Sequence, residues 1–330
     1  MKSTLYRASP ALVLFFLFLS VFAPLASAAQ SEKAVASPST TSGIHTVFLI
    51  VMENHNWTGN GSASIKGNPS APYINHSLLP MASHAENFNN PPGVHPSLPN
   101  YLWLEAGSNF GIHDDGPPSQ HAQSTHAHLV TLLQNAGISW KSYDESISGS
   151  DCPILDEGPK DSNGNALYAV KHNPFVYFDD VTGYLNLKNA SCIAHIRPFT
   201  ELQHDLSANH VARYNFITPN LCDDMHDSCS GNPIAHGDAW LSRAVPEIMN
   251  SAAYRNGGLI LITWDEAGQG NGPIGLIALS PLAKGHGYAN SIYYNHGSTL
   301  RTLEEIFGVS PLLRYASAVP DLRDLFRIFP

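Results

Sequence analysis

Acidic residues follow two of the most apolar segments of this 330-residue chain. Glu53 and Asn54 come directly after residues 45–52, and Asp265 and Glu266 come directly after residues 258–264. Adjacent carboxylates repel one another unless a cation or a proton offsets their charge. Because carboxylate and amide oxygens are preferred ligands of hard divalent cations, these residues predict a metal site. The plainer alternative is that the acids only cap loops, and each pair taken alone supports no more than that.

A serine that could act as a nucleophile lies in the segment His95-Pro-Ser-Leu-Pro-Asn-Tyr101. Ser97 immediately precedes a predicted helix over 98–106, so its hydroxyl would lie in the positive field of the helix amino terminus, where backbone N–H groups can also receive a phosphate. A nearby metal ion would lower the pKa of this hydroxyl and make it a nucleophile, and Asn100 could donate to a phosphoryl oxygen. A serine before a helix is more often only an N-cap, and both roles can hold for one residue.

Two histidines lie in loops beside predicted elements. His226 lies with Asp224 after a short apolar segment over 215–218, and His296 lies just before a predicted helix over 298–307, with Ser298 as its N-cap and Gly308 as its stop. Either histidine could bind phosphate, and His226 could instead bind a second metal. The chain has 17 histidines, and a loop histidine is more often solvated than catalytic, so only their positions single these two out.

The elements that must position these residues alternate along the chain. Predicted strands cover 45–52, 215–218, 258–264 and 274–279, and predicted helices cover 98–106, 128–136, 237–251 and 298–307. Alternating strands and helices predict an α/β fold with a mainly parallel central sheet and helices on both faces. In such sheets the site lies beyond the carboxyl ends of the strands, which would gather the acids and loop histidines at one rim. Residues 149–190 are rich in loops and show no clear pattern.

The amino terminus has the pattern of a secretory signal peptide. Lys2 and Arg7 precede an apolar run over 11–22, and Ala26-Ser-Ala28 has the small residues of a cleavage site. The alternative is a membrane anchor, but the run is shorter than the roughly 20 residues that a spanning helix needs. We expect a signal peptide over 1–28, a flexible leader over 29–43, a catalytic domain over 44–330, and export to the periplasm or the extracellular medium.

Charge and cysteine content narrow the possible partners. Removal of residues 1–28, which hold two basic residues and no acid, shifts the net charge from −10 to −12 and argues against nucleic acid as a partner. Four cysteines in an exported chain suggest two disulfides. Three pairings are possible; we favour Cys222–Cys229, which are close in sequence, with Cys152–Cys192. Zinc binding by these thiols is the alternative, but the chain has no Cys-x-x-Cys.

In combination, these blocks resemble the phosphoesterase family that groups bacterial and fungal acid phosphatases with bacterial phospholipases C. The resemblance covers about residues 45–308, and its specificity comes from the order and spacing of the blocks. The blocks are Val51-Met-Glu-Asn54, His95 to Tyr101, Thr218-Pro-Asn220 with Asp224-Met-His-Asp227, Trp264-Asp-Glu266, and Asn295-His296 with residues 298–307. The resemblance implies an alkaline-phosphatase-like fold and hydrolysis of phosphoric esters.

The resemblance also assigns roles to individual residues. One divalent metal ion, whose identity the sequence does not specify, would be held by Glu53, Asn54, Asp265 and Glu266 together with the nucleophile Ser97. His226 and His296 would be catalytic, and the substrate would also meet Asn54, Asn100, His95 and Asp224. The block Ser97-Leu-Pro-Asn100 looks like the Thr-Phe-Pro-Asn nucleophile block of nucleotide pyrophosphatases. Those enzymes carry Pro-Asp where this chain has Pro219-Asn220, and a neutral asparagine favours a single metal.

Other enzyme classes lack support in the sequence. A sulfatase needs an arginine in a Cys/Ser-x-Pro-x-Arg block, which the segment after Ser97 does not have, and a serine esterase would show Gly-x-Ser-x-Gly. Gly268-Gln-Gly-Asn-Gly272 does not fit a dinucleotide fingerprint. A non-catalytic secreted binding protein is the alternative from a different class, but it would be free to lose the acids or Ser97.

The choice between phosphatase and phospholipase C rests on three features. The chain ends soon after the last family block, no basic amphipathic helix is evident for docking on a bilayer, and His226 and His296 would be protonated more often at mildly acidic pH. We therefore expect an acid phosphatase that hydrolyses small soluble phosphomonoesters through a phosphoserine intermediate, without stable membrane insertion and in an oligomeric state that the sequence leaves open. A phospholipase C-type phosphodiesterase is the second candidate.

Overall fold

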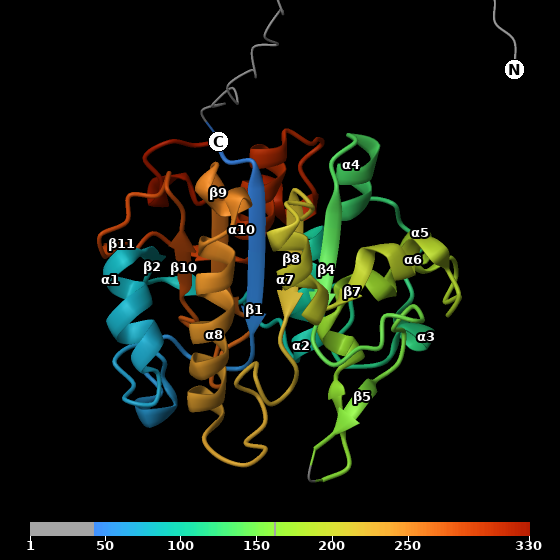
Figure 1. Cartoon of the computed structure of the whole chain (residues 1–330), viewed down its shortest axis with the longest axis horizontal. Coiled ribbons are helices and arrows are strands. Elements are labelled where there is room, and N and C mark those ends of the chain that lie inside the picture. Colours follow the sequence, from blue (N-terminus) through green and yellow to red (C-terminus); the bar gives the residue numbers. More distant parts are fainter. Residues whose placement is uncertain (1–42, 162) are drawn as a thin grey trace, which may run out of the picture. The chain divides into compact units, whose positions relative to one another are not determined.

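A computed structural model describes residues 43–161 and 163–330 of the chain. The predicted signal peptide and all but the last residue of the predicted leader lie outside the described residues. The described residues surround a central sheet of eight strands in the order β11-β2-β10-β9-β1-β8-β4-β7 (Figure 1). The strands are β1 (Thr46–Met52), β2 (Ser83–Ala85), β4 (Trp140–Asp144), β7 (Ile196–Pro198), β8 (Tyr214–Thr218), β9 (Gly258–Trp264), β10 (Leu276–Leu279) and β11 (Tyr288–Asn290).

The five strands from β9 to β7 are parallel to their neighbours, whereas β10 runs antiparallel to both β9 and β2. The strand β1 lies between β9 and β8 and is almost wholly buried, which accounts for its continuous apolar sequence. Its arrow, and that of β8, point to the lower end of Figure 1, so the carboxyl ends of the parallel strands form one rim. The predicted α/β fold with a mainly parallel sheet is confirmed.

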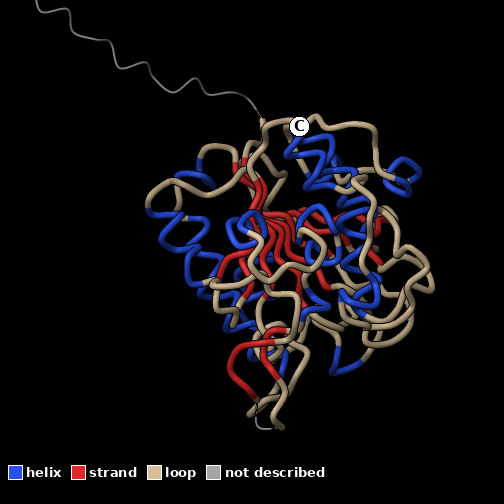
Figure 2. The backbone as a smooth tube through the Cα atoms, turned by 90° about the vertical axis from the view of Figure 1, so that its right-hand side faces the viewer, coloured by secondary structure: helices blue, strands red, loops and turns tan. Residues whose placement is uncertain are grey.

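Helices cover both faces of the sheet. In Figure 1, α7 (Thr200–Ser207) and α8 (Pro233–Met249) lie in front of the sheet, and α2 (Ser97–Ala106) and α10 (His296–Phe307) lie behind it. Figure 2 shows the strands edge-on with helices on either side. The helix α4 (Leu129–Asn135) packs against α2 and α10. All four predicted helices are present, with ends that differ by a few residues.

The start of α10 differs from the prediction. Its N-cap is Asn295, whose side chain accepts a hydrogen bond from the backbone N–H of Gly297, and Ser298 Oγ accepts from the Asn295 N–H at 3.3 Å. The prediction that Ser298 is the N-cap was therefore wrong, because Ser298 is the third helical residue of a capping box. Gly308 ends the helix in the left-handed conformation (φ 64°), as predicted.

Shorter elements connect this framework. The remaining helices are α1 (Leu79–Met81), α3 (Pro118–His121), α5 (Asp179–Thr182), α6 (Ala190–His195) and α9 (Ala252–Arg255). A π-helical turn covers η2 (Ile74–Leu78), and 3-10 turns cover η1 (Gly61–Ala63), η3 (Val170–His172), η4 (Pro174–Tyr177), η5 (Arg314–Ala318) and η6 (Arg323–Leu325). Two small sheets pair β3 (Phe88–Asn89) with β12 (Tyr294–Asn295) and β5 (Glu157–Lys160) with β6 (Ala166–Tyr168).

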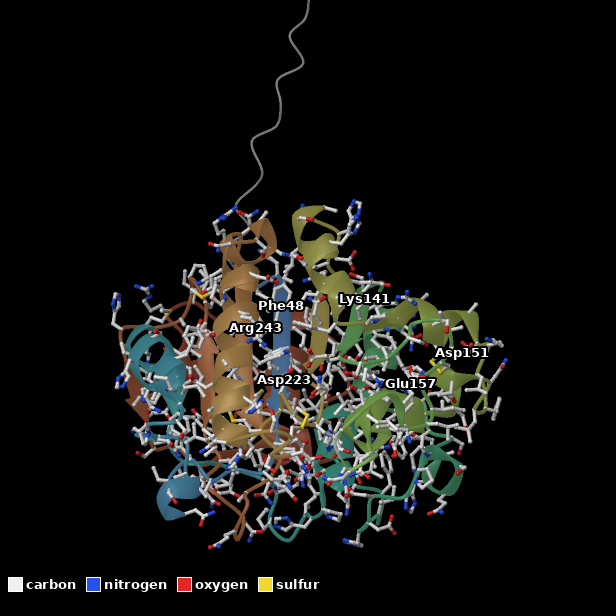
Figure 3. The ribbon with its side chains drawn as sticks, turned by 60° about the horizontal axis from the view of Figure 1, so that its bottom comes forward. Phe48, Lys141, Asp151, Glu157, Asp223 and Arg243 are labelled. Atoms are coloured by element: carbon white, nitrogen blue, oxygen red, sulfur yellow. A yellow bond between two sulfur atoms is a disulfide. The ribbon has the colours of Figure 1, made fainter. Side chains whose placement is uncertain are left out.

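Both favoured disulfides are present. Cys152 is bonded to Cys192, and Figure 3 shows this bond beside Asp151; Cys222 is bonded to Cys229. Within the described ranges no cysteine is free, which removes the alternative of a zinc site built from thiols. Two disulfides are typical of a protein that folds in an oxidising compartment.

Two further observations concern the ends and the surface of the described chain. Gly43 and Pro330 lie side by side near the amino end of β1, where a Cβ added to Gly43 would be 3.2 Å from the carbonyl oxygen of Pro330. None of the helices formed by residues 43–161 and 163–330 has the length and apolarity of a membrane span.

Candidate active site

The pairing of β1 with β9 places two acids side by side. Met52 pairs with Trp264 in parallel register, so Glu53 and Asp265 leave the sheet together. The Asp265 N–H donates to the carbonyl oxygen of Met52 at 2.9 Å, and the Glu53 N–H donates to the carbonyl oxygen of Asp224 at 2.8 Å. Glu53, Asp224 and Asp265 are fully buried. Three adjacent parallel strands therefore deliver three buried carboxylates to one rim, as the strand-end rule predicts.

Asn54 brings a further oxygen to this cluster. Its backbone has φ 39°, in the left-handed region, and its N–H donates to Asp265 Oδ1 at 3.2 Å. While Asn54 Nδ2 donates to Glu266 Oε1 at 3.4 Å, the other end of the amide lies 2.6 Å from Glu53 Oε2 and 2.9 Å from Asp265 Oδ1. With the amide rotated, its nitrogen donates to both carboxylates at these distances. With the carbonyl oxygen in place, the same position offers oxygen ligands to a hard cation.

Ser97 is the first residue of α2, and its hydroxyl donates to Glu53 Oε2 at 3.1 Å. One turn later, the hydroxyl of Tyr101 donates to Glu53 Oε1. The N-cap of α2 is Pro96, which has no side chain that can cap the helix, so the simpler prediction that Ser97 is an N-cap was wrong. The serine hydroxyl instead lies between a helix amino terminus and a buried carboxylate, which is where a nucleophile for a phosphoryl group is expected.

His172, in η3, is a residue of the site that the sequence did not single out. Its Nε2 is 3.4 Å from Glu53 Oε1 and its Nδ1 is 3.5 Å from Asp224 Oδ2, while its ring stacks on Tyr101 with centroids 5.1 Å apart. Donor atoms of Glu53, His172 and Asp224 lie within 4.8 Å of one another, so this buried group could hold a metal ion. In the sequence, His172 is only one of many histidines and lies in the loop-rich segment 149–190, where no pattern marks it as a site residue.

The two predicted histidines lie at different depths. The His226 N–H donates to Asp224 Oδ1 at 2.7 Å, and its ring pairs through Nδ1 with Asp227 Oδ1 at 2.6 Å and remains about a third exposed (32%). His296 is fully buried, donates from Nε2 to the backbone carbonyl of Asp265, and packs its ring against Phe88. His226 thus lies at the solvent edge of the site, whereas His296 supports Asp265 from behind. Contact of either ring with phosphate stays a prediction.

Glu266 holds the loop that leads to the serine. Its Oε2 accepts from His95 Nδ1 at 2.5 Å and from Asn100 Nδ2 at 3.1 Å. Asn100 Nδ2 also donates to the carbonyl oxygens of Val94 and Pro96. The carboxylate of Glu266 therefore fixes the approach to Ser97. Its predicted role as a metal ligand, and the predicted contacts of Asn100 and His95 with substrate, stay predictions.

The buried carboxylates of the cluster raise one another's pKa. Burial raises the pKa of Glu53 well above its usual value, and the charges of Asp265 and Asp224 raise it further. Burial also raises the pKa of Asp265 to about 7, with a contribution from Glu266. A divalent ion would remove much of this repulsion.

The buried histidines have lowered pKa values. Burial lowers the pKa of His172 well below its usual value and that of His296 to about 4. His172 is thereby kept in the neutral form that binds metals. The expectation that His296 is protonated at mildly acidic pH was wrong, because its ring is removed from water.

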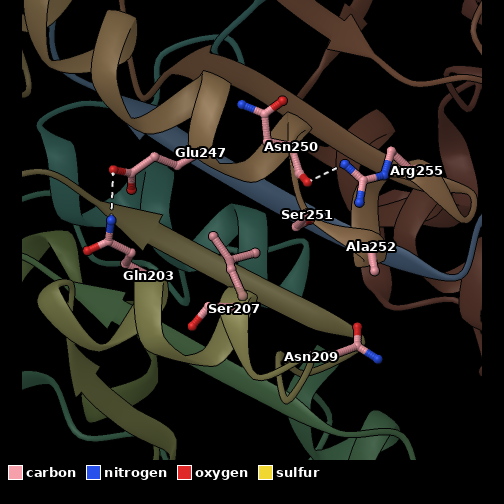
Figure 4. Close-up of a pocket in the computed structure, with 9 residues that line it drawn as sticks. Gln203, Ser207, Asn209, Glu247, Asn250, Ser251, Ala252 and Arg255 are labelled. Carbon is pink, nitrogen blue, oxygen red and sulfur yellow. Dashed lines mark hydrogen bonds between the residues drawn. The ribbon is translucent and has the colours of Figure 1, made fainter.

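A separate cavity lies away from this site. It has a volume of about 450 Å³ and lies among α7, α8 and α9, where Gln203 contacts Glu247 and Arg255 donates to the carbonyl oxygen of Asn250 (Figure 4). Its lining residues include Asn209 and Ala252, which precede β8 and β9, so it opens near the amino ends of the strands. None of the site residues described above lines it, so we place no chemistry there.

Known proteins are similar to this chain in sequence or in fold. The chain is 30% identical over 281 residues to the phosphatidylinositol-3-phosphatase of Mycobacterium tuberculosis, a match that covers 85% of this chain and 82% of that protein. It is 28% identical over 226 residues to an acid phosphatase of Aspergillus fumigatus, covering 67% of this chain and 48% of the relative. The chain therefore spans about half the length of this fungal relative.

Two solved structures have a similar fold. They are the phosphonate monoester hydrolase of Agrobacterium radiobacter (TM-score 0.53, 12% identity, covering 86% of this chain and 77% of that chain) and a protein of the alkaline phosphatase superfamily from Vibrio parahaemolyticus (TM-score 0.51, 10% identity, covering 83% and 69%). At these identities the similarity shows the fold alone. The pattern that defines the Phosphoesterase family matches residues 88–310, a segment that contains Ser97, Asp265 and Glu266. Since this segment is more than half of the chain, the protein belongs to the Phosphoesterase family, whose members are hydrolases of phosphoric ester bonds.

Proposed function

We propose that this protein is an exported, metal-dependent phosphomonoesterase of the acid phosphatase type in which Ser97 is the nucleophile. The observation that carries the proposal is the hydrogen bond from Ser97 Oγ to Glu53 Oε2 at the amino end of α2, beside the buried carboxylate of Asp265. The names of the relatives support a phosphomonoesterase, since they are acid phosphatases and a phosphatidylinositol-3-phosphatase. The disulfides, together with the amino-terminal pattern, support export.

Glu53, Asn54 and Asp265, together with Ser97, are the residues proposed to hold the metal. Their oxygens match the hard donors that divalent cations prefer, and Asp265 Oδ2 is a buried oxygen without a hydrogen-bond partner in the described residues. When bound, a divalent ion would lower the pKa of the serine hydroxyl and neutralise charge on the phosphoryl oxygens. The group of Glu53, His172 and Asp224 is the alternative position for an ion.

The chain's own residues would carry the two steps of hydrolysis. Glu53 holds the Ser97 hydroxyl by its proton and orients Oγ toward the phosphorus atom. As the bond from Oγ to phosphorus forms, the hydroxyl proton passes to Glu53 Oε2, the bond to the alcohol oxygen breaks, and His226 Nε2 donates a proton to the leaving alkoxide, since Nδ1 is engaged by Asp227. Water then gives a proton to His226 and attacks the phosphoserine, and Glu53 returns its proton to Oγ as phosphate leaves. Backbone N–H groups at the start of α2 stabilise the phosphoryl charge.

An activity screen tests this proposal. Purified protein is assayed on p-nitrophenyl phosphate, bis-p-nitrophenyl phosphate and phosphatidylcholine vesicles, with and without a chelator. We expect the monoester to be hydrolysed best, with activity lost on chelation and in Ser97→Ala but kept in the matched control Ser191→Ala, whose exposed side chain lies in α6. Efficient vesicle cleavage with little monoesterase activity would instead assign a phospholipase C-type phosphodiesterase. No hydrolysis of any ester would leave the binding-protein alternative.

A further inference from the structure

A lysine that the proposed mechanism does not use lies beside the site. Lys171 immediately precedes His172 in η3, and its Nζ is 2.9 Å from Asp115 Oδ2. The other oxygen of the same carboxylate, Asp115 Oδ1, accepts the backbone N–H of Leu98 at 3.0 Å. Leu98 follows Ser97 in the first turn of α2. One carboxylate thus joins the ammonium group of Lys171 to an N–H group at the helix terminus that carries the nucleophile.

The charge of Lys171 acts on the whole acidic cluster. Burial raises the pKa values of Glu53, Asp224, Asp265 and Glu266, and in each case the positive charge of Lys171 offsets part of the rise. The ammonium group therefore lies within electrostatic range of every carboxylate around Ser97. A phosphoryl group bound at Ser97 would lie within the same field.

Solvent reaches the pair through a groove. Lys171 and Asp115 both line a cavity of about 410 Å³, together with Asp156, Asn165 and several apolar residues. The β5–β6 hairpin borders this groove and projects at the lower end of Figure 1, beyond the carboxyl ends of the parallel strands. The side chain of Lys171 is 21% exposed, so an anion that enters the groove can contact its ammonium group.

We propose that Lys171 binds a phosphoryl oxygen of the substrate and that Asp115 is an internal anion that occupies this position when substrate is absent. The inference rests on the proposed phosphomonoesterase function and adds a substrate-binding residue to it. The two donors that Asp115 bridges, an ammonium group and a helix-terminal N–H, are the types that proteins use for phosphate. A phosphate dianion carries more charge than a carboxylate and can displace it from these donors.

The position of Asp115 affects the affinity of the protein for phosphate. Because Asp115 must leave before phosphate binds, the apparent affinity is lower than it would be at a free site. Loss of Lys171 should therefore weaken phosphate binding, whereas loss of the charge on Asp115 should strengthen it. A purely structural ion pair predicts something else: either change would break the same contact and weaken binding in the same direction.

The experiment uses this difference in sign. The probe is inorganic phosphate, measured as a competitive inhibitor of p-nitrophenyl phosphate hydrolysis at constant pH and metal concentration. We expect Lys171→Met to raise the inhibition constant about tenfold or more, Lys171→Arg to restore most of the affinity, and Asp115→Asn to lower the constant several-fold. The matched control is Lys188→Met, which removes a lysine paired with Asp151 on the surface near Cys152 and should leave the constant unchanged.

Two outcomes would overturn the inference: an unchanged inhibition constant in Lys171→Met, or a raised constant in both Lys171→Met and Asp115→Asn. Thermal melting of each variant checks that it is folded. Binding of phosphate to the same variants in a Ser97→Ala background, measured by calorimetry, separates this inference from the proposed function. Opposite shifts in phosphate affinity would support Lys171 even if Ser97→Ala retained turnover and the proposed nucleophile were rejected.

Discussion

The hydroxyl of Ser97 lies 3.1 Å from Oε2 of Glu53, although the two residues are 44 positions apart in the sequence. Glu53 reaches this position at the end of β1, and Ser97 does so at the start of α2, which packs behind the sheet. The same carboxylate receives the hydroxyl of Tyr101 on its other oxygen. Glu53 is therefore held from two sides by one helix, which fixes the geometry between the acid and the proposed nucleophile before substrate arrives.

A covalent intermediate should be detectable on Ser97. If Oγ attacks phosphorus, protein quenched in acid during turnover of p-nitrophenyl phosphate should carry one phosphate on the peptide that contains Ser97. Mass spectrometry measures this directly. Protein quenched without substrate is the control, and phosphate found on another residue, or on none while Ser97→Ala turns over normally, would reject the role.

Asp265→Asn should weaken metal binding and leave the protein folded. The substitution keeps the shape of the side chain but removes a charge from a buried cluster of acids, so the protein should stay folded while the activity falls by about two orders of magnitude or more. Added divalent cation should raise the melting temperature of the wild type, because a ligand that binds only the folded state stabilises it, and should do so far less in the variant. Asp151→Asn, on the surface, is the matched control. Equal metal-induced shifts in wild type and Asp265→Asn would contradict the proposed ligand set.

His172→Gln tests the residue that the sequence did not reveal. The imidazole contacts Glu53 and Asp224, so its loss should lower kcat/KM by about 10- to 100-fold and weaken the apparent metal affinity. A metal titration of activity measures both quantities. His204→Gln serves as the control, since that side chain is 81% exposed and lies far along the chain in α7. An unchanged metal affinity would show that the Glu53–His172–Asp224 group is not where the ion binds.

The two disulfides should affect different properties. Cys152–Cys192 closes a segment with a sequence separation of 40, against 7 for Cys222–Cys229, so its removal should cost more stability, within the usual range of about 2–4 kcal/mol. The shorter bridge encloses Asp224 and His226 in the sequence. Its removal should therefore lower kcat/KM even under conditions in which the variant remains folded. Paired Cys→Ala variants are compared by chemical denaturation, which measures the loss of stability, and by kcat/KM, which measures the loss of activity. A larger loss of activity from the Cys152–Cys192 variant would contradict this division.

Glu304 should make the protein less stable as the pH rises. Its carboxyl is fully buried in α10 and accepts the Leu313 N–H, and burial raises its pKa from 4.5 to about 7. A group whose pKa is raised in the folded state stabilises that state fully below its unfolded pKa, and this contribution is lost as the pH rises toward 7. Wild-type protein should thus lose stability between pH 5 and pH 8, by roughly 2 kcal/mol from this residue.

Denaturation of Glu304→Gln at both pH values measures this contribution. The variant should show a smaller loss between pH 5 and pH 8, because an amide does not titrate. Glu247→Gln, an exposed position in α8, should follow the wild type. A pH dependence in Glu304→Gln as large as that of the wild type would contradict the assignment.

The sequence predicted the framework of the site because its key strands are fully apolar. The strands β1 and β9 are buried on both faces, so their ends and the acids that follow could be located from composition alone. The strand β4 was not predicted from the sequence, because Lys141 and Asp144 interrupt its apolar pattern. The structure accommodates them by pairing Lys141 with Asp205 and by hydrogen-bonding Asp144 to Ser142, contacts that only the tertiary fold supplies.

His172 and Lys171 show a second reason why part of the site could not be predicted from the sequence. They lie in a short 3-10 turn within a segment of loops, where neither helical nor strand periodicity exists to indicate which way a side chain points. Tyr101 lies in a helix that was predicted, but its ring would be read from sequence as core packing. Its contact with Glu53 depends on how α2 packs against β1. The residues around Tyr101 in the sequence do not indicate how the helix packs.

The closeness of Gly43 and Pro330 has a practical consequence. The two residues lie near the amino end of β1, away from the rim that carries Ser97. A short linker could join them without crossing the sheet, and termini that lie close together are the condition under which circular permutation and insertion into a host protein are tolerated. Residues 43–330 could therefore be inserted as one segment into a surface loop of another protein, with the rim that carries Ser97 away from the junction.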